Sequence, residues 1–575
     1  MLSRMIEKAK AGESLWLPVL REQFARAEGG AELVLRLRRL DGGVRDETLV
    51  LPPWENEEER TLVLDYLKAS VFNLLSVWSG EELCFYYDVD NAPLAALLRE
   101  LPAAFQAPGY QKVLRIAGRL CRAFDRPPFA FTTAPLGEYR PAPVQAAPAR
   151  ADLVETLRAT CRRAEGLALC GMDVGGTDVK LAASLDGRLV CVKEYDWNPA
   201  QSGRVEEIIE PLLLLTRLMS ACLAAARFGA ETALQERLAA ALRKDAGDGE
   251  MAAAVAAAER AYGARLPLLD GIGVSFPDVV IRDRILGGET PKTQGMRQNT
   301  ALDYEAEFAR LGGLKELLQP LCRPGASVRL TNDGNMAAYT AAMELAHSDD
   351  PDCIAEGVIA HTLGTDFGTG WLDANGSIPP VPLELYDLLL DLGNRPAAAW
   401  PPADLRSTRN ENSGLPGLRR YLGQAAAYRL AWELDSALLD GFVRQDGELL
   451  VIPTMPEDLR KPCLERLMQL AAGGDENAEE IFRRIGAHFA MAAREMERLL
   501  SPRPRLRFLF GRFVKSPRCF QLICEGFARY TPEIGLVVAD EDLACTSLMR
   551  QLAAREDATV AQFGQAVGAL YFALS

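Results

Sequence analysis

The chain has 575 residues, too many for a single hydrophobic core, so we expect two to four domains. Hydrophobic residues make up 49% and charged residues 25%, which is ordinary for a folded soluble protein. The formal net charge of −15 argues against a nucleic-acid-binding protein, but it leaves a small phosphorylated ligand open, because such a ligand senses only the local field.

Cysteines and histidines predict no metal cluster. The 12 cysteines have no C-x-x-C spacing and the chain has only three histidines, so no structural zinc is expected. Free thiols of this kind fit a reducing cytoplasm. The polar stretch Met1–Trp16 lacks the apolar core of a signal peptide. The most apolar stretch, Pro211–Ala226, contains Arg217 and is too short to span a bilayer, so we expect a buried helix and no membrane association.

Residues 1–138 predict a separate α+β domain. Leucines at 33, 35 and 37 alternate with other residues ahead of Asp41-Gly42-Gly43, which indicates a hairpin. Apolar residues recur with helical spacing over Glu57–Trp78, and Leu83–Val89 is typical of another strand. This part has no helix-turn-helix pattern and no catalytic constellation. The Pro- and Ala-rich stretch after it indicates an extended linker or a strap packed along one domain, and we place a linker at residues 139–165.

The stretch Leu167–Ser184 combines two β-like runs with a Gly-Gly turn, which is typical of a hairpin. Gly175 and Gly176 leave backbone N–H groups free to close on an anion, and Thr177 adds a hydroxyl group. Lys180 adds a positive charge nearby, and the Asp173 carboxylate suits a metal-bound water. These are the parts of a phosphate site, although a plain hairpin turn with a surface Asp would have the same sequence.

The remaining elements predict a chain whose second half repeats the first in outline. A third strand follows the opening hairpin directly, which differs from a dinucleotide-binding fold, where a helix follows the first Gly-rich turn. Two strand–Gly/Thr turn–strand units, near Gly175 and near Gly364, could hold a polyphosphate from both sides. The expected elements are strand Arg188–Tyr195, helices within Val205–Tyr262, strands Gly271–Pro277 and Val328–Thr331, helix Met336–Ala346, strands Gly357–Leu363 and Trp371–Ala374, helices within Pro416–Leu500, strand Leu506–Phe510 and helix Val560–Ala573.

The order of these motifs resembles the sugar-kinase superfamily with the actin/hexokinase ATPase fold, and within it the bacterial ROK family of glucokinase-like proteins. Five stretches carry the resemblance over about residues 166–575: DVGGT at Asp173–Thr177, GIGVSFP at Gly271–Pro277, NDGN at Asn332–Asn335, TLGTDFGTG at Thr362–Gly370, and FLFGRFV at Phe508–Val514 with the terminal AVGALYFALS. The resemblance implies an α/β, two-lobed actin-like ATPase (ribonuclease H-like) fold. Lobe I would span 166–335 and be completed by helix 560–575, and lobe II would span 336–559.

The resemblance also implies ATP and Mg²⁺ as cofactors. The turns at Gly175–Thr177 and at Gly364 and Thr365 would bind the β- and γ-phosphates, with Asp173 on the metal, directly or through water. Gly511 would mark the adenine side.

Asp333 would be the general base, and Asn332 would hydrogen-bond a neighbouring substrate hydroxyl. A carboxylate before a helix is also a common N-cap, which is the alternative for Asp333.

The acceptor side is predicted from a polar loop, Gly287–Arg297, in the place where the family contacts its substrate. Glu289 and Lys292 are substrate-binding candidates, and the loop's two cations, Lys292 and Arg297, suggest an acidic or phosphorylated acceptor, although a solvated loop would look the same. Glu384 is a further candidate by position alone.

Several departures mark a distant member of the family. The E-x-G-H sugar motif and the zinc-binding cysteines of the family are missing, and Asp366 stands where the second phosphate motif has Gly. A carboxylate there repels phosphate unless a metal intervenes, so Asp366 could bind a second Mg²⁺, point away, or mark a site that no longer binds ATP.

We therefore expect a cytoplasmic ATP- and Mg²⁺-dependent kinase of a sugar-like small molecule. The alternative is a non-catalytic ligand-sensing or scaffolding protein with the same fold. No nucleic-acid or membrane partner is expected, and a homo-oligomer is left open.

Overall fold

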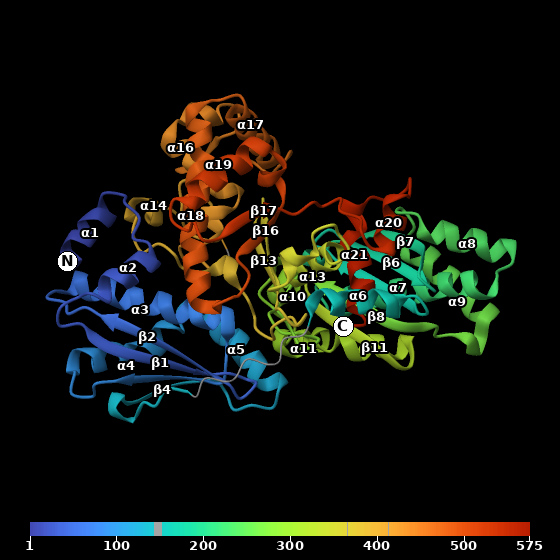
Figure 1. Ribbon diagram of the computed structural model, residues 1–575, viewed down its shortest axis with the longest axis horizontal. Coiled ribbons are helices and arrows are strands. Elements are labelled where there is room, and N and C mark those ends of the chain that lie inside the picture. Colours follow the sequence, from blue (N-terminus) through green and yellow to red (C-terminus); the bar gives the residue numbers. More distant parts are fainter. Residues whose placement is uncertain (143–151, 365, 412) are drawn as a thin grey trace.

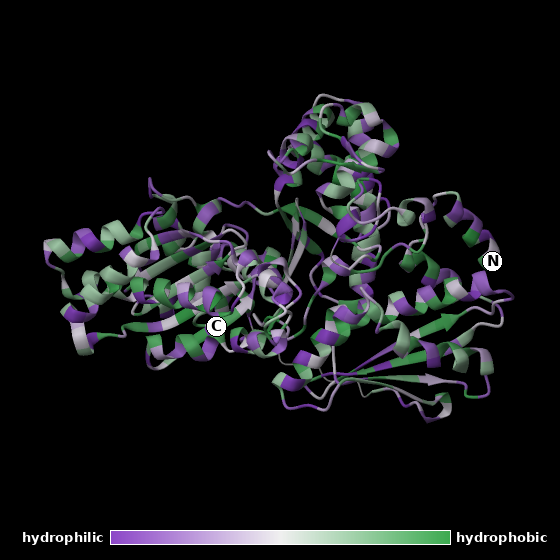
Figure 2. Ribbon diagram, turned by 180° about the vertical axis from the view of Figure 1, so that it is seen from behind, coloured by the Kyte–Doolittle hydropathy of each residue, from purple (hydrophilic) through white to green (hydrophobic). Residues whose placement is uncertain are grey.

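The computed structural model describes residues 1–142, 152–364, 366–411 and 413–575. It confirms the predicted fold class, because two α/β lobes with related sheets stand beside an additional N-terminal α+β domain (Figure 1). The helical part of lobe II rises between the N-terminal domain and lobe I (Figure 1). Hydrophobic and hydrophilic residues alternate along most of the helices, as expected for helices with one face on a core (Figure 2).

The N-terminal domain is a four-stranded sheet in the order β2-β1-β3-β4. The predicted hairpin is confirmed, with Leu35 of β1 opposite Glu47 of β2, and the predicted long helix is α3. The leucines of β1 at 33, 35 and 37 are fully buried, as the alternation predicts. The elements are α1 (Leu2–Lys10), α2 (Leu17–Phe24), β1 (Ala31–Arg38), β2 (Val44–Leu51), α3 (Glu57–Trp78), β3 (Glu82–Tyr87), α4 (Ala92–Ala104), α5 (Gln111–Ala123) and β4 (Ala130–Pro135).

Lobe I contains a five-stranded sheet in the order β11-β8-β5-β6-β7. Strands β5, β6 and β7 are antiparallel neighbours, whereas β8 and β11 run parallel to β5 on its other side. This order is the ribonuclease H-like topology. The elements are α6 (Leu153–Ala164), β5 (Ala168–Val174), β6 (Asp178–Leu185), β7 (Arg188–Asp196), α7 (Glu206–Phe228), α8 (Thr232–Leu242), α9 (Asp248–Tyr262), β8 (Leu269–Phe276), β9 (Val280–Ile281), β10 (Arg284–Ile285), α10 (Gln294–Gln298), α11 (Tyr304–Gly312), α12 (Leu314–Leu318) and β11 (Cys322–Asn332). Helix α13 (Asp333–Leu345) follows β11, crosses the predicted lobe boundary at residue 335 and packs mainly on the first two strands of lobe II.

Lobe II repeats the same plan with four strands in the order β13-β12-β16-β17. β13 is antiparallel to β12, and β16 and β17 follow parallel on the other side, so the predicted repeat is confirmed. The elements are β12 (Val358–Leu363), β13 (Phe367–Leu372), α14 (Arg395–Ala399), α15 (Arg419–Leu422), α16 (Gln424–Leu434), β14 (Arg444–Asp446), β15 (Leu449–Val451), α17 (Arg460–Ala472), α18 (Glu476–Leu500), β16 (Leu506–Phe510), α19 (Pro517–Ala528), β17 (Gly535–Val538), α20 (Ser547–Ala553) and α21 (Val560–Phe572).

The C-terminal helix α21 returns to lobe I and lies across β5 and β8 (Figure 1). Two strand glycines make this approach possible. A Cβ at Gly171 would collide with the Ala566 carbonyl, and one at Gly273 would collide with the Ala569 carbonyl. Gly568 lets the same helix approach Thr340 of α13. Gly171, Gly273 of the GIGVSFP stretch and Gly568 of the terminal helix therefore serve close packing.

The N-terminal domain is anchored on the long helix α18 of lobe II. Trp78 donates a 2.7 Å hydrogen bond from its indole nitrogen to the Leu499 carbonyl. Asn73 and Arg21 both donate to the fully buried Glu495 carboxylate, at 3.0 and 2.7 Å. Leucines of the N-terminal sheet and apolar residues of α18 belong to one continuous hydrophobic core.

Part of the predicted linker is structured. Residues 153–164, expected to be extended, form helix α6, whose Leu153 and Leu157 are buried in the core shared with α13 and α21. The apolar spacing of this helix was hidden by the Pro- and Ala-rich run before it. Residues 143–151 lie outside the described part of the chain.

The predicted apolar helix is α7. By length and composition it could cross a membrane, but 67% of its most apolar window is buried inside the protein, as in the core helix of a soluble fold.

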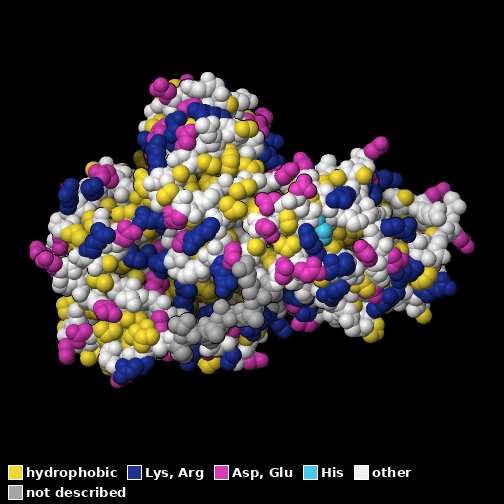
Figure 3. Space-filling model, in the orientation of Figure 1, with side chains coloured by type: hydrophobic (Ala, Val, Ile, Leu, Met, Phe, Trp, Pro, Cys, Tyr) yellow, Lys and Arg dark blue, Asp and Glu magenta, His cyan; other side chains and the backbone are white. Residues whose placement is uncertain are grey.

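On the face seen in Figure 3, Lys and Arg side chains alternate with Asp and Glu, so this face carries no field of one sign.

Candidate active site

A cavity of about 1090 Å³ lies between the lobes and is lined by residues of both. Lobe I contributes the ends of β8 and β11 and the start of α13, and lobe II contributes the turn between β12 and β13 together with parts of α17. The carboxyl ends of parallel strands in both sheets therefore face the same space, where ligand sites of α/β proteins gather.

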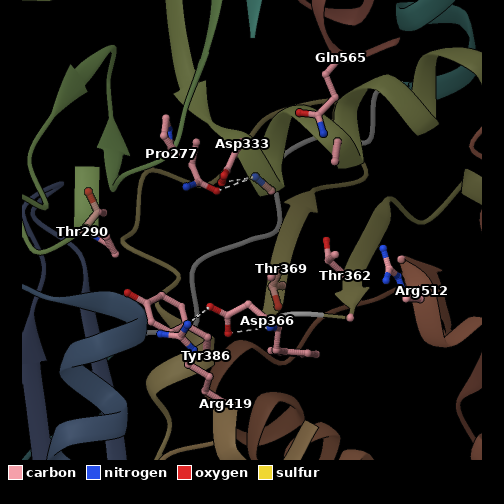
Figure 4. Close-up of a pocket in the computed structure, with 18 of the residues that line it drawn as sticks. Pro277, Thr290, Asp333, Thr362, Asp366, Thr369, Tyr386, Arg419, Arg512 and Gln565 are labelled. Atoms are coloured by element: carbon pink, nitrogen blue, oxygen red, sulfur yellow. Dashed lines mark hydrogen bonds and ion pairs between the residues drawn. The ribbon is translucent and has the colours of Figure 1, made fainter. Parts of the chain in front are cut away.

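Asp333 lies at the first position of α13, directly after β11. The N-cap of this helix is Asn332, whose Oδ1 accepts from the Gly334 N–H at 2.9 Å, so the N-cap alternative for Asp333 is wrong. The same N–H donates to Asp333 Oδ1 at 2.8 Å. Burial raises the pKa of Asp333, while the Lys292 charge and the Gly334 N–H oppose the rise. Asp333 is thus a half-buried carboxylate with enhanced basicity that opens into the cavity (Figure 4).

Asn332 is less available for a hydrogen bond to a substrate hydroxyl group than predicted, because both ends of its amide have protein partners. Its Nδ2 donates to the Asp278 carbonyl at 2.9 Å, and its Oδ1 caps the helix. The amide therefore positions α13 against the loop after β8, although it still lines the cavity.

The first turn, between β5 and β6, is stabilised by hydrogen bonds to the backbone of Gly175. The Gly175 N–H donates to the Asp178 carbonyl at 2.7 Å, and the Trp197 indole donates to the Gly175 carbonyl at 3.1 Å. Gly176 and Thr177 are exposed, and within the described residues their N–H groups have no hydrogen-bond partner. These two N–H groups are free to bind an anion.

Lys180 does not serve this turn as predicted. Its ammonium is paired with the Asp178 carboxylate two residues away, and it is not part of the cavity wall. The cation beside the turn is Lys292, whose Cε would lie 3.3 Å from a Cβ placed on Gly176.

The second turn, between β12 and β13, lines the cavity through Gly364 and Asp366, whereas residues 175–177 of the first turn are not part of its wall. Gly364 donates to the Asp366 carbonyl at 3.3 Å, and Gln424 donates to the Gly364 carbonyl at 2.8 Å. Thr365, predicted to bind phosphate, lies outside the described residues. Asp366 is paired with Arg419 at 2.9 Å (Figure 4). Burial raises the pKa of Asp366, while the Arg419 charge opposes the rise.

Two glycines join the second turn to the proposed base. A Cβ on Gly370 would collide with the Gly334 carbonyl, so β13 and the start of α13 pack backbone against backbone. The Trp371 N–H donates to Asn335 Oδ1 at 3.0 Å across the same contact.

Gly511, at φ +96°, lies against the Leu363 carbonyl at the end of β12, where a side chain would not fit.

Both acceptor-side carboxylates line the cavity, but side chains of α5 hold them. Glu289 accepts from Arg115 at 2.9 and 2.8 Å and from Arg119 at 3.0 Å. Glu384 accepts from Lys112 at 2.7 Å and from the Tyr386 hydroxyl at 2.8 Å. These helix α5 cations were missed in the sequence. Their signal was a basic stripe at positions 112, 115, 119 and 122, which fall on one face of a helix.

Asp173 ends β5 and accepts a 2.8 Å hydrogen bond from the Ser275 hydroxyl. Burial raises its pKa to about 6; the Ser275 hydrogen bond lowers it and the Asp333 charge raises it. Within the described residues its second carboxylate oxygen has no protein partner. One carboxylate with a free oxygen fits a hydrated Mg²⁺, which commonly keeps several waters. No group of three or more His, Cys, Asp or Glu side chains suited to a metal occurs in the described part of the chain.

Sequence comparisons found no family model and no curated protein that matches the chain. Similar solved structures include a ROK-family glucokinase from Streptomyces griseus, in complex with glucose and AMPPNP, at 16% identity, covering 71% of this chain and 99% of that one, with a TM-score of 0.38. A ROK hexokinase from Thermus thermophilus is 17% identical, covers 71% and 100% of the two chains, and has a TM-score of 0.37.

A ROK-family transcriptional regulator, a homologue of the E. coli Mlc protein, matches equally well, at 13% identity, 71% and 80% coverage and a TM-score of 0.38. These structures come from the family that the motifs resemble.

Proposed function

We propose that this chain is an ATP- and Mg²⁺-dependent kinase that transfers the γ-phosphoryl group to a hydroxyl group of a sugar-like acceptor, with Asp333 as general base. The main support is that the Asp333 carboxylate opens into the same cavity as the turn at Gly364 and Asp366 on the opposite lobe. Gly176, whose N–H group is free, lies against the side chain of Lys292, which lines this cavity.

The proposed mechanism assigns a separate task to each side of the cavity. Asp333 keeps Oδ1 on the Gly334 N–H, so Oδ2 can accept the acceptor hydroxyl proton as the phosphoryl group moves. Such help typically contributes about 10²- to 10⁴-fold to the rate. The free N–H groups of Gly176 and Thr177 would bind phosphate oxygens, and movement of the lobes would exclude water.

Mg²⁺ would be held by Asp173, through water or directly, and when bound it neutralises phosphate charge. Glu289, Glu384 and Asn332 stay our candidates for acceptor binding. The domain division at residues 138, 165 and 335 and the cytoplasmic location likewise stay predictions.

A non-catalytic ligand-sensing role is the second candidate, and Asp366 favours it. Its carboxylate faces the space where phosphate would bind, and its partner Arg419 is thereby occupied. A protein that binds a sugar without ATP would tolerate this pair.

The test compares Asp333→Asn with the wild type in an ADP-release assay over a panel of sugars and sugar acids. Asp333→Asn should abolish transfer while Mg·ATP binding, measured by titration calorimetry, persists. Asp245→Asn, on a surface side chain that is 82% exposed, is the matched control. Wild-type turnover in Asp333→Asn ends the general-base assignment, and a wild type that binds no nucleotide at millimolar concentration supports the ligand-sensing alternative.

A further inference from the structure

Lys292 stands out among the cations of the cavity wall. Three of the others are paired: Arg419 with Asp366, Arg512 with Glu465, and Lys515 with Glu541. Lys461 is exposed to solvent on α17. Lys292 is half-buried, and among the described residues it has no hydrogen-bond or ion-pair partner. A half-buried cation in a cavity wall, without a partner among the described residues, favours a bound anion at this place.

The loop that carries Lys292 is held firmly. Arg297, the loop's second predicted cation, does not face a ligand: it donates to the Gly288 and Thr290 carbonyls at 2.9 and 2.8 Å and to the Thr293 hydroxyl at 2.7 Å. The Tyr304 hydroxyl donates to the Gly288 carbonyl at 2.6 Å. Arg297 is thus a structural residue, and Lys292 remains as the one lysine that this braced turn presents.

The position of Lys292 relates it to both predicted phosphate turns. Its Cε lies against Gly176 of the first turn. Its charge favours the ionised forms of Asp333 in lobe I and Asp366 in lobe II, and so opposes the rise in pKa that burial causes at both. The Lys292 side chain thus lies against Gly176 of the first turn, and its charge acts on a carboxylate of each lobe.

We propose that Lys292 is a catalytic residue that binds the γ-phosphoryl group of ATP and takes the part that the sequence assigned to Lys180. The inference rests on the proposed function. In the reaction, the acceptor hydroxyl gives its proton to Asp333 and its oxygen forms a bond to the γ-phosphorus. The bond from that phosphorus to the β–γ bridging oxygen breaks, and the electron pair leaves with ADP. Lys292 stays protonated and donates to the transferred oxygens, whose charge it neutralises.

The alternative is the sequence prediction that Lys292 binds an acidic acceptor. The two assignments differ in their dependence on the γ-phosphate. A lysine that binds the γ-phosphoryl group raises the affinity for a nucleoside triphosphate but not for a diphosphate. A lysine that binds the acceptor affects neither affinity.

The experiment measures binding of Mg·AMPPNP and Mg·ADP by titration calorimetry to the full chain and to Lys292→Met, Lys292→Arg and Lys244→Met. Lys244 is a lobe I lysine with a 57% exposed side chain and serves as the matched control. Lys292→Met should weaken Mg·AMPPNP binding about ten- to hundredfold, the range for a charge-assisted hydrogen bond, and leave Mg·ADP binding unchanged. Lys292→Arg should restore part of the loss, and Lys244→Met should match the wild type.

Equal losses for both nucleotides, or no loss for either, would overturn the assignment. If the wild type binds both nucleotides and Lys292→Met has the same ratio of Mg·AMPPNP to Mg·ADP affinity, the role of Lys292 is refuted but the proposed function is not. A wild type that binds neither refutes the proposed function itself. Since Lys292 supports no other side chain, thermal unfolding of Lys292→Met should match the wild type, and Lys292→Arg gives a second reading if it does not.

Discussion

Lys112 of the N-terminal domain donates a 2.7 Å hydrogen bond to Glu384, which lies 272 positions later in the wall of the cavity. The same ammonium donates to the Tyr386 hydroxyl at 2.8 Å and is paired with the Asp387 carboxylate. Burial alone lowers the pKa of Lys112, but the charges of Asp387 and Glu384 outweigh it and raise this pKa well above its ordinary value. The N-terminal domain therefore supplies a permanently charged group to the site.

We expect Lys112→Met to lower the free energy of unfolding by about 3–5 kcal/mol, because it leaves the Glu384 and Asp387 carboxylates without their buried cation. Chemical unfolding measures the loss. Lys112→Arg should recover part of the stability.

The matched control is Lys8→Met. Lys8 pairs with Glu13 at the surface, with side chains 44% and 56% exposed, and such pairs contribute about 1 kcal/mol or less. Equal effects of the two methionine variants would contradict a structural role for the Lys112 cluster.

The same helix also contacts lobe I. Arg115 and Arg119 bind Glu289, and Arg119 and Arg122 bind Glu305. Because the N-terminal domain shares its core with α18 of lobe II, α5 links the acceptor-side loop of one lobe to the other lobe. The predicted acceptor carboxylates at 289 and 384 are thus oriented by one helix of a domain whose sequence indicated no function.

Local patterns predicted most of the fold. The apolar alternation of Leu33, Leu35 and Leu37 and the spacing over Glu57–Trp78 depend on neighbours along the chain, so they were sufficient to predict β1 and α3. The motifs placed Asp333 at a strand–helix junction for the same reason.

Contacts between residues that are far apart in the sequence could not be predicted. Lys180 and Lys292 are both single lysines near glycines, but the lysine that lies against Gly176 is Lys292, which is far from it in the sequence. Likewise Asn332 donates to the Asp278 carbonyl, 54 positions earlier, which leaves its amide less available to a substrate. Periodicity and motif spacing carry no information on such contacts.

Gly370→Ala should both destabilise the protein and impair transfer. Its Cβ would collide with the Gly334 carbonyl, so β13 and the start of α13 must move apart. Overpacking of this kind typically costs about 1–3 kcal/mol, and a shift of about 1 Å in the Asp333 carboxylate can cost about 10²-fold in rate. Thermal unfolding and ADP release measure the two effects. Gly137→Ala, where the added Cβ meets open space, is the control, and an unimpaired Gly370→Ala would show that this backbone contact is dispensable.

Asp278→Asn should change how stability depends on pH. Burial raises the pKa of Asp278 to about 7; hydrogen bonds from Gly288 and Val279 oppose the rise, and the Glu384 charge adds to it. Between about pH 4 and about pH 7 the unfolded chain has lost this proton while the native protein keeps it. The native state then binds more protons, so the free energy of unfolding falls as the pH rises through this window.

The Asn variant lacks this titration, so its thermal midpoint should fall less between about pH 5 and about pH 7 than that of the wild type. Asp245→Asn, on an exposed side chain, should follow the wild-type curve. Parallel curves for wild type and Asp278→Asn would contradict a raised pKa at this position.

Asp366→Gly should strengthen nucleotide binding. The Asp366 carboxylate lines the cavity in the second phosphate turn and occupies Arg419 at 2.9 Å. Removing it eliminates an anion that repels phosphate and releases a guanidinium that can bind phosphate through paired hydrogen bonds. We expect Mg·AMPPNP affinity to rise on the order of tenfold, which corresponds to about 1.4 kcal/mol. Arg419→Met should weaken binding, and the double variant should show whether the two effects are coupled. If Asp366→Gly instead weakens binding, and does so only when Mg²⁺ is present, Asp366 is a metal ligand and its pairing with Arg419 belongs to the ligand-free protein.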